Sequence, residues 1–137
     1  MSVAERRRLR VLSLVAASGC LVLGLVLQLL ERSPLVDVAG SVLYVGFAGM
    51  LLAAVWPALS SPAVASVAFA FAAAVELLQL TRVPQAVVAV FPPARLLLGS
   101  SFDPIDLVAY TGGAVLLFVA HLGLVRLAAR QPATTAR

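Results

Sequence analysis

Two pairs of polar side chains stand out in an otherwise apolar chain, because their spacing places each pair on one face of a helix. Glu76 and Gln79 are three residues apart, and Asp106 and Tyr110 are four residues apart. A carboxyl group beside an amide or a phenol can bind a cation or a polar headgroup, or it can transfer a proton as a general acid or base. These four residues are the first candidates for a functional site.

The other groups that catalysis commonly needs are not evident in the sequence. One histidine and one cysteine cannot form a His/Cys metal cluster, and we find no nucleophile motif and no Gly-rich phosphate loop. We therefore expect no metal and no cofactor, and we assign no catalytic residue. An enzyme that uses Glu76 or Asp106 as acid or base is the weakest of three hypotheses.

The elements that must position these side chains are long apolar helices. The 137 residues are 62% hydrophobic and 12% charged, and the mean hydropathy is +1.06. Crossing a bilayer takes about 20 apolar residues in a helix, and the continuous runs are too long for barrel strands. The sequence predicts an all-α four-helix transmembrane bundle, forming one integral membrane domain over residues 1–137, with spans at about 11–30, 38–56, 63–80 and 104–127.

The basic residues, all ten of them arginine, predict the orientation of this bundle. Three of them, Arg32, Arg82 and Arg95, fall on one side of the predicted spans, and seven fall on the other. The positive-inside rule then places both termini in the cytoplasm and the loop 82–102 outside. We expect no nucleic-acid binding, because the arginines report topology and no aromatic-basic patch accompanies them. The seven are Arg6, Arg7, Arg8, Arg10, Arg126, Arg130 and Arg137.

This topology gathers the scattered polar residues into one layer near the outer face. An ionised carboxylate deep in the bilayer costs at least about 2.5–3.5 kcal/mol, so such residues face the bundle interior and find partners. We expect Glu76 either protonated and hydrogen-bonded or ionised and paired with Arg95. The predicted polar site consists of Asp37, Ser41, Glu76, Gln79, Arg95, Asp106 and Tyr110, with Tyr44 in the same layer.

Several of these polar residues also have a purely structural interpretation. Asp103 suits the N-cap of the last helix, with Pro104 at its first position and Asp106 in its first turn. Tyr44 and Tyr110 are also typical membrane-interface anchors. His121 is expected to be a hydrogen-bonded residue of the bundle interior.

The outer loop and the small residues complete the expected architecture. The loop 82–102 contains two apolar clusters that are too short to span, so it should lie on or dip into the outer membrane surface. Small residues four apart, Gly49 with Ala53 and Ala109 with Gly113, allow close helix contacts. That pattern serves a homodimer as readily as the fold of one chain.

These motifs resemble an uncharacterised bacterial membrane family, domain-of-unknown-function family 2809. The stretches "FAFAAAVELLQL" and "ARLLLGSSFDPIDLVAYTGG" carry the resemblance. The family usually has a Gly-Asp pair early in the second helix, where this chain has Gly40 and Ser41; Asp37, one turn earlier, is a candidate replacement. The positions that match the family pattern are Glu76, Gln79, Arg95, Gly99, Phe102, Asp106 and Tyr110.

The Glu-x-x-Gln pattern is also distantly similar to the VanZ-like proteins, which implies a setting at the cell envelope. We therefore expect a multi-pass protein of the bacterial cell membrane. Its polar layer either binds a headgroup, a small envelope molecule or a cation, or only holds the helices of a structural or accessory subunit together. The expected partners are the lipid bilayer and a second copy or a larger membrane complex.

Overall fold

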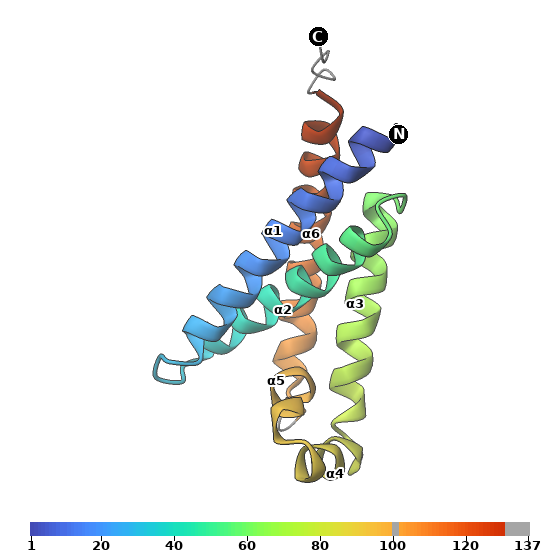
Figure 1. Cartoon of the computed structure of the whole chain (residues 1–137). Helices are drawn as coiled ribbons and strands as arrows, with labels where there is room; N and C mark the ends of the chain where they lie inside the picture. Colours follow the sequence, from blue (N-terminus) through green and yellow to red (C-terminus); the bar gives the residue numbers. More distant parts are fainter. Residues whose placement is uncertain (100–101, 131–137) are drawn as a thin grey trace.

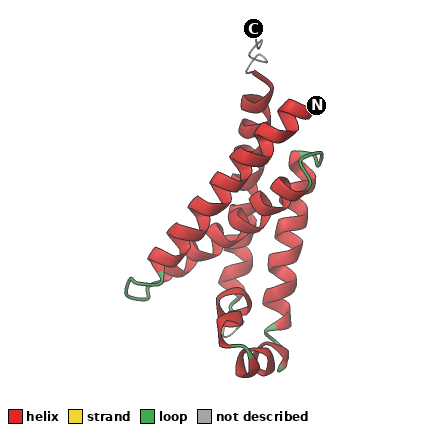
Figure 2. Cartoon of the chain, viewed as in Figure 1, coloured by secondary structure: helices red, strands yellow, loops and turns green. Residues whose placement is uncertain are grey.

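The computed structural model describes residues 1–99 and 102–130, and this part of the chain contains helices and no strand (Figures 1 and 2). Four helices are long and apolar enough to cross a membrane: α1 (Val3–Leu27), α2 (Pro34–Val55), α3 (Ser61–Leu78) and α6 (Pro104–Arg130). Three short helices, α4 (Val83–Val90), η1 (Pro92–Ala94) and α5 (Arg95–Leu98), connect α3 to α6. The chain is therefore an all-helical protein with four candidate membrane spans.

Side-chain caps explain where the helices begin. Ser33 and Ser60 accept hydrogen bonds from the backbone N–H groups of Val36 and Ala63, and a proline follows each cap within two residues. Asp103 caps α6 in the same way, since its Oδ1 accepts from the N–H of Ile105 at 2.9 Å. The predicted cap at Asp103 is confirmed.

The first helix begins earlier than the apolar run that identifies it. Ser2 and Glu5 form a capping box, so α1 starts at Val3 and includes the basic segment before the apolar residues. Arg10 then reaches the end of α2, where its Nε donates to the carbonyl of Ala54 at 2.9 Å. The basic residues before the apolar run are thus helical.

The helices form two pairs that diverge toward one end. In Figure 1 the α1–α2 hairpin tilts away from α3 and α6 as it approaches the connection between α1 and α2. We call the end that holds residues 28–33, 79–99 and 102–103 the loop end, and the end where α1 begins and α6 ends the terminal end. The two pairs are therefore farthest apart at the loop end.

Small residues let α2 and α6 approach each other closely at their crossing. A Cβ on Gly49 would lie 2.1 Å from Leu117 Cδ2, and a Cβ on Gly113 would lie 3.2 Å from the Cα of Val42. Ala53 and Ala109 are buried beside them. The two small-xxx-small pairs are therefore used within one chain, where they bring α2 and α6 together.

The core is narrow and the outer faces of the long helices are apolar. Ala53, Val64 and Ala72 are fully buried at the centre of the cluster. Large apolar side chains on α6, such as Val108 and Val115, are mostly exposed. Exposed aliphatic surface of this extent fits contact with lipid chains rather than water.

Candidate functional site

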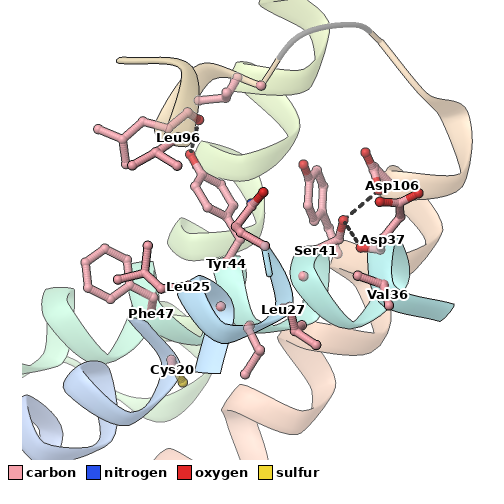
Figure 3. A pocket seen from close by; sticks show the side chains of 18 of the residues that line it. Cys20, Leu25, Leu27, Val36, Asp37, Ser41, Tyr44, Phe47, Leu96 and Asp106 are labelled. Carbon is pink, nitrogen blue, oxygen red and sulfur yellow. Dashed lines mark hydrogen bonds between the residues drawn. The ribbon is translucent and has the colours of Figure 1, made fainter. Parts of the chain in front are cut away.

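A cavity of about 350 Å³ lies at the loop end, where the two helix pairs diverge. Its walls come from the second half of α1, the first half of α2, the end of α3, α5 and the start of α6 (Figure 3). The cavity brings together six of the seven predicted site residues: Asp37, Ser41, Glu76, Gln79, Asp106 and Tyr110. Tyr44 and Asp103 also line it.

Glu76 is buried, with 1% of its surface exposed, and both of its carboxyl oxygens accept hydrogen bonds. Oε1 accepts from the backbone N–H of Asp103 at 2.6 Å, and Oε2 accepts from the Tyr110 hydroxyl at 3.2 Å. Asp103 is the residue just before α6, so the carboxyl group faces the positive end of that helix dipole. The predicted burial of Glu76 and its contact with Tyr110 are confirmed.

Arg95 does not serve as the cation for Glu76. It begins the short helix α5, its side chain is exposed, and it does not line the cavity. No described residue forms an ion pair with it. The start of α6 takes the place that the sequence assigned to Arg95, because free N–H groups at a helix N-terminus stabilise a carboxylate without a basic side chain.

Asp106 and Ser41 connect α6 to α2 on the other side of the cavity. The Ser41 hydroxyl lies 2.6 Å from Asp106 Oδ1 and 3.1 Å from the carbonyl of Asp37, one turn earlier in α2 (Figure 3). The Asp37 carboxyl group is exposed and accepts no hydrogen bond from the described residues. Ser41 thus contacts the backbone of Asp37 and the carboxyl group of Asp106, and neither aspartate forms an ion pair with a described residue.

A short backbone segment, residues 96–99, which we call the strap, lines the cavity and is held by two side chains. Tyr44 donates from its hydroxyl to the carbonyl of Leu97 at 3.1 Å, and Gln79 donates from Nε2 to the carbonyl of Leu98 at 2.7 Å. Gly99 ends the strap with φ +67°, and a Cβ there would lie 2.6 Å from Gln79 Nε2. Only glycine combines that backbone angle with that close approach.

The tyrosines form the aromatic part of the lining. The rings of Tyr44 and Tyr110 are 6.2 Å apart at their centroids, and Tyr44 also stacks on Phe71 at 6.3 Å. Leu25 of α1 and Phe47 of α2 add apolar side chains to the lining (Figure 3). The lining is therefore polar toward α3, α6 and the start of α2, and apolar toward α1.

A second polar group, at the terminal end, was only partly anticipated from the sequence. His121 is fully buried and its Nδ1 lies 2.9 Å from the hydroxyl of Ser61, which begins α3. Its Nε2 has no partner among the described residues, and neither does the buried hydroxyl of Ser13 in α1. The expected hydrogen bond of His121 is confirmed. Ser61 was not predicted to be its partner, because a serine at this place is typical of a helix start.

The chemistry available at the cavity is that of hydrogen bonding and charge. Within residues 1–99 and 102–130, no group of three or more His, Cys, Asp or Glu side chains is arranged to hold a metal ion. The groups that face the cavity are carboxylates, phenols, an amide and a hydroxyl. They suit the binding of a small polar or charged group beside an apolar one.

A family model matches a large part of this sequence, including much of the cavity lining. Searches of curated proteins and of solved structures gave no match. The family "Protein of unknown function (DUF2809)" matches residues 30–114, which is more than half of the chain and includes every polar lining residue of α2, α3 and α6. Ser13, His121 and the α1 wall lie outside the match. The chain therefore belongs to the DUF2809 family of proteins of unknown function.

Proposed function

We propose that this protein is a multi-pass protein of the bacterial cell membrane that binds a small polar molecule or a lipid headgroup in the cavity at the loop end. The observation that carries the proposal is the cavity itself. Its volume of about 350 Å³ is in the usual range for small-molecule sites, and it combines apolar walls with a few convergent polar groups. A layer that only fastened helices together would need no such space.

The arginine distribution supports an outward-facing site. Among the described residues, six arginines lie at the terminal end and three, Arg32, Arg82 and Arg95, lie at the loop end. By the positive-inside rule the terminal end is cytoplasmic, and the cavity then opens at the outer half of the membrane. The resemblance to VanZ-like proteins inferred from the Glu-x-x-Gln pattern would imply the same envelope setting.

A structural or accessory role is the second candidate, and one observation favours it. Three lining side chains form hydrogen bonds to the backbone of another part of the chain: those of Glu76, Tyr44 and Gln79. Such bonds fasten α2, α3, the strap and α6 to one another, which a helper subunit of a larger complex would also need.

A cavity-filling variant with a matched control separates the two roles. Gly24 lines the cavity, and a Cβ there would meet nothing within 4 Å. Gly19, also on α1, has the same freedom but does not line the cavity. Native mass spectrometry of the purified protein should show a bound small molecule or lipid that Gly24→Phe loses and Gly19→Phe retains. Equal spectra for the three proteins would favour the structural role.

A further inference from the structure

The lining of the loop-end cavity indicates the charge of its ligand. We propose that the cavity takes an amphiphile with a cationic head, such as a primary ammonium group on an alkyl chain. This inference rests on the proposed binding function and makes it specific. The polar wall would hold the ammonium group, and the apolar wall would hold the first carbons of the chain.

The balance of charge in the lining is negative. Four carboxyl groups and one guanidinium group, that of Arg32, line the cavity. Arg32 is exposed and forms no ion pair with a described carboxyl group. A phosphate or carboxylate ligand would therefore meet an excess of like charge, which costs several kcal/mol when it is desolvated.

Two of the four carboxyl groups have acceptor oxygens that no described residue uses. Glu76 is occupied by the N–H of Asp103 and by Tyr110, and Asp103 itself caps α6. Asp106 has one described partner on its carboxyl group, Ser41, and the Asp37 carboxyl group has none. An ammonium group has three N–H donors and no acceptor, which suits a lining rich in carboxyl acceptors.

A further acceptor at the cavity lacks a donor. Gln79 donates through Nε2 to the strap, while its Oε1 is buried and has no partner in the described part of the chain. Buried acceptors are nearly always paired, and no donor for this one is found within residues 1–99 and 102–130. Tyr44 and Tyr110 add aromatic rings, whose faces attract cations.

The apolar wall shows that the ligand also has a chain. Leu21 and Leu25 line the cavity, yet each is 46% exposed on the outside of α1. Because α1 faces lipid, the cavity reaches the lipid-facing surface at this point. A ligand can therefore place its head beside Asp37 and Asp106 while its tail stays in the bilayer.

Thermal unfolding of the full chain in a neutral detergent tests the proposal with three probes of equal chain length: dodecylammonium, dodecyl phosphate and dodecanol. We expect saturable stabilisation by dodecylammonium alone. The apparent Kd should rise about tenfold, equivalent to about 1.4 kcal/mol, in Asp37→Asn, and Asp106→Asn should act in the same direction. Glu31→Gln, which removes an exposed carboxyl group outside the cavity, should leave the Kd unchanged.

Each other outcome overturns the inference in a distinguishable way. Stabilisation by dodecyl phosphate or dodecanol that Gly24→Phe abolishes would keep the binding function and refute the cationic head. Ammonium binding that is equal in wild type, Asp37→Asn and Glu31→Gln would show that the detergent-like probe acts elsewhere. A bound molecule in the mass spectra without any response to dodecylammonium would also refute the cationic head. No response to any probe and no bound molecule would remove both proposals.

Discussion

The carboxyl group of Glu76 accepts the backbone N–H of Asp103 at 2.6 Å, so the end of α3 is bonded to the start of α6 across the connecting short helices. Tyr110, two turns into α6, donates to the other oxygen. One side chain thus fixes both the position and the rotation of α6 relative to α3. Since Glu76 also lines the cavity, the same contacts shape the polar wall.

Glu76→Ala should destabilise the protein by about 1–3 kcal/mol, because it leaves the buried hydroxyl of Tyr110 without its acceptor and also removes the part-buried bond to the N–H of Asp103. Glu76→Gln should cost less, since the amide oxygen can still accept from Asp103. Chemical unfolding in detergent micelles measures both. Glu31→Ala, at an exposed carboxyl group, is the control, and equal stability of Glu76→Ala and Glu31→Ala would contradict the role of Glu76.

Of the two adjacent glycines Gly112 and Gly113, only Gly113 should be intolerant of a larger side chain, because it lies in the contact between α2 and α6. Gly113→Leu should destabilise by about 1–3 kcal/mol, because even its Cβ meets the backbone of Val42 at 3.2 Å. Gly112→Leu should be close to neutral, since a Cβ there meets nothing within 4 Å. Thermal unfolding compares them directly. If the two variants have the same melting temperature, α2 and α6 do not pack as described.

Ser61 and His121, the buried pair at the terminal end, should be coupled in their contributions to stability. Ser61→Ala removes the only partner of His121 among the described residues and should cost about 1–3 kcal/mol. Adding His121→Leu should recover part of that loss, because an apolar side chain no longer needs a partner in a buried site. A double-mutant cycle on the free energy of unfolding gives the coupling. Strict additivity would show that the hydrogen bond contributes nothing to stability.

The proposed topology predicts which positions react from outside the cell. In a Cys20→Ser background, Ala89→Cys on α4 should react with a membrane-impermeant maleimide in intact cells, because the residue is exposed at the loop end. Ala129→Cys, exposed near the end of α6, should react only after lysis. The opposite pattern would place the cavity on the cytoplasmic side.

The sequence was sufficient for the elements and for the gathering of polar residues, since long apolar runs and helix caps are local signals. The sequence was insufficient to predict the hydrogen-bond partners of the polar side chains, because several of these partners are backbone groups. Glu76 bonds to an N–H, and Gln79 and Tyr44 bond to carbonyls of the strap. Every residue type carries such groups, so no pattern of side chains reveals them. Arg95 is one of the two expected partners of Glu76 because a basic side chain is visible in a sequence, whereas a helix terminus that stabilises an anion is not.

The distance along the chain between Glu76 and its partners also bears on how the protein enters the bilayer. Asp103 lies 27 residues after Glu76, and Tyr110 lies 34 residues after it. Until the start of α6 reaches the same layer, the carboxyl group of Glu76 lacks both of these partners, and a lone carboxyl group is costly among lipid chains. We therefore expect α3 and α6 to settle in the bilayer together, with α4 and α5 as the link between them.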